Sequence, residues 1–145
     1  MRRLLTILVL AVGCNDRTST GAVETPASAI ITFAFAGYPA DTIRVAFRDA
    51  PSIAQATNYL TRKTGPRFPI GPIVRGAGVD ARYPFHFDAD SVKLAEVAIE
   101  LCDGRLMRTM AELDAFMRGA TGDANAPRAV WCPWNAYPVK VESGT

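Results

Sequence analysis

The residues best suited to chemistry gather between Tyr83 and Asp103, around the chain's single histidine, His86. An acidic turn, Asp88-Ala89-Asp90-Ser91, follows the histidine directly. A histidine beside carboxylates is a candidate general base, but it needs a nucleophile or a water molecule to activate. No nucleophile motif accompanies His86 in the sequence. A small hydrolase is therefore the minor interpretation, and a satisfied or half-exposed strand histidine is the main one.

The acidic turn is also a candidate calcium site. Asp88, Asp90 and Ser91 place oxygen ligands at alternating positions, as calcium loops do, and Glu96 or Glu100 could complete the shell. The stretch lacks the central glycine and the final glutamate of an EF-hand, and Asp-x-Asp-Ser is also an ordinary turn. The same carboxylates could pair for glycoside hydrolysis. Calcium is the one cofactor that the sequence suggests, and a solvated turn is the simpler interpretation.

A second distinctive segment is Trp131-Cys132-Pro133-Trp134, which holds both tryptophans. Tryptophan is enriched at binding hot spots, so a rigid loop presenting Trp134 could engage a protein or a sugar ring. The alternative is that both indoles fill the core. We expect Trp131 to be buried and leave both possibilities open for Trp134. Pro133 and Trp134 are the candidate binding residues.

The amino terminus has the pattern of a signal peptide. Met1-Arg2-Arg3 precedes the apolar run Leu4 to Val12, which is shorter than the about 20 residues needed to cross a bilayer. The segment from Leu10 to Cys14 resembles a bacterial lipobox. We therefore predict a signal peptide over residues 1–13 and acylation of Cys14, which places the protein in the cell envelope outside the cytoplasm. An ordinary secretory signal, giving a secreted protein, is the alternative.

In such an oxidising compartment two cysteines usually pair, and Cys102 and Cys132 are the two that lipidation leaves. Closing a loop of about 31 residues would stabilise the fold by roughly 3 to 4 kcal/mol in the chain-entropy model. The alternative is a free nucleophilic cysteine with only His86 to recruit. Zinc is disfavoured, because one histidine and two oxidised cysteines supply too few ligands.

The charge of the chain argues against a nucleic-acid partner. The formal net charge of +2 falls to zero when Arg2 and Arg3 leave with the signal peptide. A neutral domain without a basic stripe lacks the electrostatic footprint of a nucleic-acid binder. The expected partner is an envelope protein or a small ligand, and contact with the membrane is expected through the lipid alone.

The first half of the domain is predicted to form a hairpin followed by a helix. Large apolar side chains occupy every second position in residues 29–36 (Ile31, Phe33, Phe35) and again in residues 42–48 (Ile43, Val45, Phe47). This alternation predicts two antiparallel strands joined at residues 37–41. Asp49 can cap a helix and Pro51 suits its first turn, so a helix is expected over residues 51–62. Its inner side is expected to hold Ile53, Ala56, Thr57 and Leu60.

The middle of the domain gives weaker signals. Residues 68–76 carry prolines and glycines at intervals that favour an edge strand or an irregular crossover over a central strand. Tyr83, Phe85 and Phe87 share one face of a predicted strand. Residues 92–102 fit either a helix or a strand, and the alternation over residues 97–101 favours a strand.

The last part of the domain is predicted to contain one helix and two strands. Thr109 and Glu112 have the spacing of a capping box, which begins a helix that stops at Gly119. Residues 129–134 and 137–141 are expected to form a strand pair. The side chains expected to face the core are Met110, Leu113, Phe116 and Met117 on the helix, and Val139 and Val141 on the last strand.

Together these elements predict an α+β fold: a mainly antiparallel sheet with two helices packed on one face and one disulfide. Residues 14–28 are predicted to be a lipidated, flexible tether and residues 29–145 a single domain.

Several motifs resemble a family of small secreted domains, some labelled calmodulin-binding-protein-like. The most specific are Glu100-Leu101-Cys102-Asp103 and Trp131-Cys132-Pro133-Trp134, and Phe85-His86-Phe87-Asp88 adds to them. The resemblance spans residues 30–141, implies a shared fold and supports the pairing of the cysteines. It implies no catalytic residue, and calmodulin is not expected outside a bacterial cell. We therefore expect a non-catalytic envelope binding domain, with a calcium-dependent binding or adhesion domain and a small hydrolase as alternatives.

Overall fold

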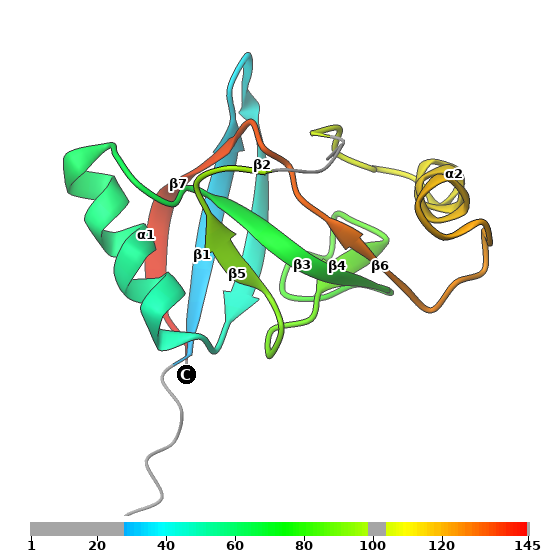
Figure 1. The fold of residues 1–145 in the computed structure, drawn as a ribbon, viewed down its shortest axis with the longest axis horizontal. Helices are drawn as coiled ribbons and strands as arrows, with labels where there is room; N and C mark the ends of the chain where they lie inside the picture. Colours follow the sequence, from blue (N-terminus) through cyan, green and yellow to red (C-terminus); the bar gives the residue numbers. More distant parts are fainter. Residues whose placement is uncertain (1–27, 99–103, 145) are drawn as a thin grey trace, which may run out of the picture.

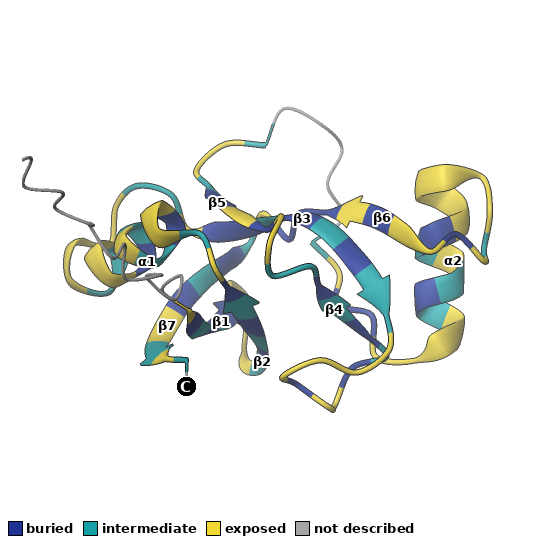
Figure 2. Ribbon diagram, turned by 90° about the horizontal axis from the view of Figure 1, so that it is seen from below, coloured by how far each residue is buried: buried dark blue, intermediate teal, exposed yellow. Residues whose placement is uncertain are grey.

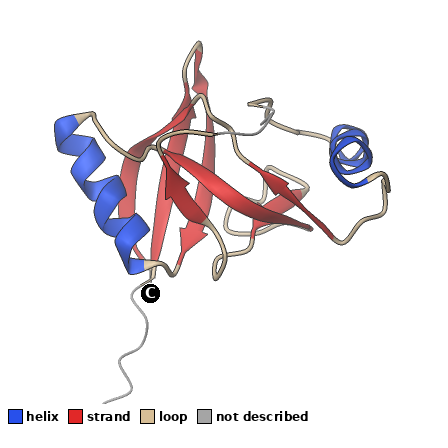
Figure 3. Cartoon of the chain, viewed as in Figure 1, coloured by secondary structure: helices blue, strands red, loops and turns tan. Residues whose placement is uncertain are grey.

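The computed structural model describes residues 28–98 and 104–144, which form two antiparallel sheets and two helices (Figures 1 and 3). The α+β class is confirmed. The prediction of one sheet with both helices on one face is wrong, because α1 and α2 lie at opposite ends of the molecule. The elements are β1 (Ala29–Phe35), β2 (Tyr38–Phe47), α1 (Ala50–Arg62), β3 (Phe68–Arg75), β4 (Phe85–Phe87), β5 (Lys93–Ala95), α2 (Met110–Thr121), β6 (Arg128–Trp131) and β7 (Ala136–Ser143).

The first sheet has the strand order β2-β1-β7. The predicted hairpin of β1 and β2 is confirmed, and Gly37 turns it with a φ of 86° that favours glycine. The predicted pairing of the last two strands is wrong: β7 pairs with β1, whereas β6 pairs with β3 in the other sheet. The chain changes sheets at the turn that contains Trp134, where the Ala36 N–H donates to the carbonyl of Asn135 at 2.8 Å.

The second sheet is built around β3, which pairs with β4, β5 and β6. The prediction of an edge or irregular segment here is wrong. Along β3, β5 pairs with residues 68–70 and β4 with residues 73–75, so Pro72 lies between these two short registers. Its carbonyl accepts a hydrogen bond from the Asp88 N–H at 2.9 Å. Pro72 also pairs with Val130 of β6. The carbonyl and N–H of a strand residue point to the same edge, so the missing N–H faces Asp88 and not the β6 ladder, and a proline is tolerated there.

The strand predicted over residues 97–101 does not match the described part of this segment. The strand lies earlier, at Lys93–Ala95, and the Val97 side chain is 73% exposed. Residues 99–103 lie outside the described residues. The alternation of apolar residues over 97–101 did not locate β5, which forms only three residue pairs with β3, at Lys93–Ala95.

The two helices begin where their capping residues predict. In α1 the Asp49 carboxylate accepts the Ser52 N–H, and in α2 the complete capping box of Thr109 and Glu112 is present. The inward faces were predicted less well, since Thr57 and Met110 are exposed. The second helix also continues through Gly119 to Thr121 and ends at Gly122, whose φ of 82° forms a left-handed cap.

One core joins both sheets, and buried residues run along β1 and β3 through the middle of the molecule (Figure 2). The predicted face of Tyr83, Phe85 and Phe87 is buried, which confirms that part of the alternation. Trp131, on β6, is 1% exposed and lies against two of these rings. In contrast, Val139, which was predicted to face the core, is 44% exposed.

The Asp49 cap predicts an acid-dependent loss of stability. Hydrogen bonds from Lys93 and Ser52 lower the Asp49 pKa from 3.8 to about 2. Because the Asp49 pKa is lower in the folded protein than in the unfolded chain, the ionised carboxylate stabilises the fold fully above about pH 4. This contribution to the free energy of unfolding is lost as the pH falls to about 2. In urea unfolding at neutral pH, Asp49→Ala is expected to cost about 1 to 2 kcal/mol.

Asp49→Asn is the matched control for this prediction, because asparagine caps a helix as well as aspartate does. We expect Asp49→Asn to retain most of the cap while losing the acid-dependent part of the stability. Equal slopes of stability against pH in wild type and Asp49→Asn would contradict the assignment.

Candidate functional site: a cleft between the hairpin and the last turn

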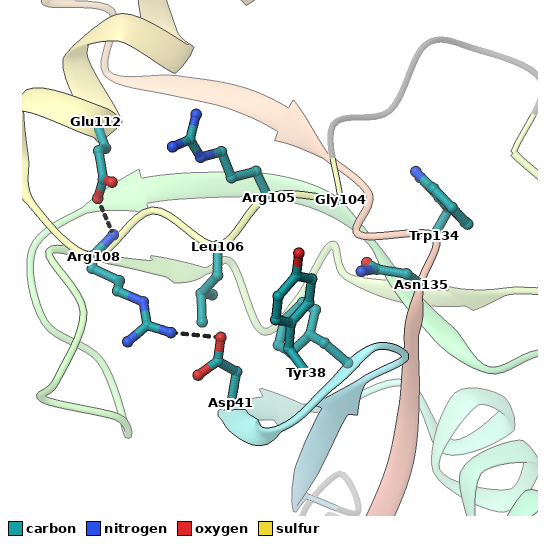
Figure 4. Close-up of a pocket in the computed structure, with 10 residues that line it drawn as sticks. Tyr38, Asp41, Gly104, Arg105, Leu106, Arg108, Glu112, Trp134 and Asn135 are labelled. Carbon is teal, nitrogen blue, oxygen red and sulfur yellow. Dashed lines mark hydrogen bonds and ion pairs between the residues drawn. The ribbon is translucent and has the colours of Figure 1, made fainter.

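A cleft of about 660 Å³ opens between three segments that are far apart in the sequence (Figure 4). The β1–β2 hairpin forms one side and the turn between β6 and β7 forms another. The segment that leads into α2 closes the third side. The lining residues are Phe35, Tyr38, Asp41, Gly104, Arg105, Leu106, Arg108, Glu112, Trp134 and Asn135.

Two exposed aromatic side chains line this cleft. Tyr38 is 67% exposed and Trp134 is 54% exposed, whereas Trp131 lies in the core. The structure thus separates the two tryptophans and places Trp134 at the surface. Pro133 is buried, so it supports the turn, and Trp134 is the residue of the predicted binding pair that faces solvent.

The charged residues of the cleft hold its walls together. The Arg108 guanidinium donates to Asp41 at 2.5 Å, which links the hairpin to the segment before α2. This carboxylate raises the pKa of Arg108. Glu112 accepts the N–H groups of Arg108 at 2.7 Å and Thr109 at 3.0 Å, and these backbone donors lower the Glu112 pKa. The capping box of α2 therefore also fixes the backbone that carries Arg108.

One buried acceptor in the cleft wall lacks a donor. Within the described residues, the Asn135 Oδ1 is buried and accepts no hydrogen bond. Gly104 approaches it closely: a Cβ there would lie 2.6 Å from this oxygen and 3.3 Å from the Trp134 Nε1. Only glycine fits at this position without a shift of the turn.

The acidic turn lies elsewhere, and its carboxylates are engaged. Asp88 accepts from the Asp90 N–H at 3.2 Å and from the Ser91 hydroxyl at 3.1 Å. Asp90 pairs with Arg48 at 3.0 Å. In the part of the chain that the structure describes, no group of three or more histidine, cysteine or acidic residues is placed to hold a metal. Of the remaining ligands considered for calcium, Glu96 is exposed and Glu100 lies outside the described residues.

His86 lies in a second, smaller cavity together with Asp88. Its Nδ1 is 2.8 Å from the Gly76 carbonyl oxygen, and because a carbonyl only accepts, this nitrogen carries a hydrogen. Among the described residues that line this cavity there is no serine, threonine or cysteine. The structure thus places His86 and Trp134 in separate sites, and gives His86 a backbone partner.

The remaining predicted residues concern processing and cross-linking. Cys132 is buried at 4% exposure, whereas its predicted partner Cys102 lies outside the described residues. Cys14 and the predicted signal peptide lie outside them as well. Within residues 28–98 and 104–144, no helix has the length and apolar character needed to cross a membrane.

Sequence reasoning missed most of the cleft. The sequence indicates only a simple turn at Tyr38, and it singles out neither Asp41 nor Arg108. The available signal was an aromatic residue at a hairpin tip, where polar and small residues are more common. The capping box located Glu112 but gave no indication that it faces a cleft.

The fold and the cleft define a small α+β domain with an aromatic-lined cleft at one end. Residues 29–144 match the family model of the BP-74 N-terminal domain, and the chain belongs to this family. The match confirms that the chain contains a recognised domain over nearly the span that the resemblance covers. Searches of curated proteins and of solved structures found no match.

Proposed function

We propose that this protein is a non-catalytic envelope domain that binds a protein partner in the cleft between Tyr38 and Trp134. The observation that carries the proposal is the exposure of both aromatic side chains at one cleft, at 67% and 54%. Large aromatic side chains left in water at a concave site are typical of binding surfaces.

The composition of the cleft favours a protein partner. Tryptophan, tyrosine and arginine are the residue types most enriched at hot spots of protein interfaces, and all three line this cleft. The ion pair of Asp41 with Arg108 fixes the walls before a partner arrives, which reduces the entropy lost on binding.

We further propose that the domain is tethered to the membrane through a lipid on Cys14. An unstructured chain of 14 residues, the length of the predicted tether over residues 15–28, has a root-mean-square reach of roughly 20 Å, which is enough to hold a domain off the membrane. The signal-peptide pattern, the lipobox and the polar tether support this arrangement, and a secreted form is the alternative.

Alkylation of the cysteines tests both the lipid and the disulfide. If Cys14 is acylated and Cys102 is bonded to Cys132, alkylation of the unreduced full chain labels no cysteine. Reduction in denaturant is then expected to expose two thiols, read by intact-mass spectrometry. Labelling of both Cys102 and Cys132 before reduction would overturn the disulfide, and labelling of Cys14 would overturn the lipid.

Affinity capture followed by binding measurements tests the cleft. The oxidised protein is used as bait in an envelope extract, with calcium or with chelator, and a captured protein is then purified for titration. Trp134→Ala is expected to weaken its binding by about 10- to 100-fold while leaving the melting temperature nearly unchanged. Tyr38→Ala is expected to weaken binding in the same direction.

Val139→Thr is the matched control, because Val139 is an exposed apolar residue that does not line the cleft. It is expected to bind the partner like the wild type. Undiminished binding by Trp134→Ala and Tyr38→Ala would refute the cleft as the binding site. Capture that is lost in chelator would favour the calcium-dependent alternative instead.

A further inference from the structure

The second cavity, of about 350 Å³, lies where the free edge of β2 approaches β4. We propose that it is a binding site for an oxyanion, the carboxylate or phosphate group of a small molecule. The proposal does not depend on the cleft, because none of the residues that line this cavity lines the other. Two arginines and one unpaired backbone N–H carry the argument.

Among the described residues, the guanidinium groups of the two arginines, Arg44 and Arg128, have only distant partners. Arg44 reaches the Val79 carbonyl at 3.4 Å and Glu142 at 3.7 Å, and Arg128 reaches Asp88 at 3.9 Å. Charge-assisted hydrogen bonds between a guanidinium and an oxyanion are ordinarily about 2.7 to 2.9 Å long. Both guanidinium groups therefore have donors available for shorter bonds to an incoming anion.

The backbone of β2 supplies a further donor at the same cavity. The N–H groups of Arg44 and Arg48 point away from β1, since they donate to Asp80 at 3.0 Å and to Ala89 at 3.1 Å. Alternate residues of a strand direct their N–H groups to the same edge, so the Ala46 N–H faces this edge too. Ala46 lines the cavity, and within the described residues its N–H has no acceptor there.

The charge and size of the cavity fit a small anion. Asp88 is the one carboxylate among the described lining residues, against two arginines, and its oxygens already accept hydrogen bonds from its own turn. Buried Phe87 and the neighbouring Val45 form an apolar wall, which strengthens electrostatic attraction at the arginines. A volume of about 350 Å³ is near the lower end of ligand sites, so the expected ligand is small.

Nuclear magnetic resonance of the ¹⁵N-labelled full chain in detergent tests the site directly. Inorganic phosphate and, separately, acetate are added at constant ionic strength, and the Ala46 amide resonance is followed. We expect a saturable shift of this resonance with at least one of the two anions. Arg128→Gln and Arg44→Gln are each expected to weaken binding by about tenfold.

Arg62→Gln, on α1, is the control for general charge effects and is expected to bind like the wild type. A response to phosphate alone supports a phosphate-bearing ligand, and a response to acetate alone supports a carboxylate. An Ala46 resonance that neither anion shifts would overturn the proposal. Equal weakening by Arg62→Gln and Arg128→Gln would also overturn it. The Trp134→Ala variant is expected to bind the anion normally, which separates this site from the cleft.

Discussion

Replacing Trp131 with alanine is expected to lower the free energy of unfolding by about 3 to 5 kcal/mol. The indole is 1% exposed and bridges the second sheet to the core. It meets Phe85 edge-on with ring centroids 5.2 Å apart and stacks on Phe87 at 5.4 Å. Its removal forfeits the burial of a large apolar surface and both ring contacts, and leaves a cavity in the centre of the molecule.

Urea unfolding of Trp131→Ala beside Trp134→Ala is the appropriate measurement. The two tryptophans are three positions apart, yet Trp134 is 54% exposed, so its truncation should cost under about 1 kcal/mol. Trp131→Phe should lose less than Trp131→Ala, because a smaller aromatic ring retains part of the contacts. Equal destabilisation by Trp131→Ala and Trp134→Ala would show that both indoles are core residues.

Features set by neighbouring residues could be predicted from the sequence. The alternation of β1 and β2 requires only that each strand have one buried face, and the burial of Ile43, Val45 and Phe47 follows from it. The start of each helix depends on a capping side chain within three residues, at Asp49 and Thr109. In both cases the deciding contacts are local, so the pattern contains the necessary information.

The cleft could not be predicted, because it forms only when distant segments meet. Tyr38, Arg108 and Trp134 come from three separate parts of the chain, and no periodic pattern links them. The ion pair joins Asp41, in the hairpin near the start of the domain, to Arg108, which comes much later in the sequence, just before α2. Trp134 was recognised as a candidate from its residue type, whereas its exposure depends on where the chain crosses between sheets.

The central position of β3 was missed for a related reason. Its prolines argued against a central strand, since a proline cannot donate to a ladder hydrogen bond. At Pro72 the structure avoids this penalty by pairing β3 with two short strands, β4 and β5, whose registers leave Pro72 out, whereas Pro69 lies opposite Leu94 within the β5 ladder. Where those short strands begin and end is a property of the tertiary fold, and residues 68–76 alone do not specify it.

Gly71, between these ladders, gives the second large prediction. A Cβ at this position would lie 2.9 Å from the Val92 Cα and 3.4 Å from the Ser91 carbonyl oxygen. Both atoms belong to the backbone of the turn before β5, and Val92 is fully buried. The turn cannot move away without disturbing the core, so Gly71→Ala is expected to cost about 1 to 3 kcal/mol.

Gly119→Ala is the matched control, since it introduces the same methyl group at another glycine. Gly119 lies inside α2 with open space around a Cβ, so alanine there should stabilise the protein by about 0.5 to 1 kcal/mol. The two substitutions should therefore move the urea midpoint in opposite directions. If Gly71→Ala were as stable as the wild type, the turn before β5 could not pack against the middle of β3, and the registers that place β4 and β5 along that strand would be wrong.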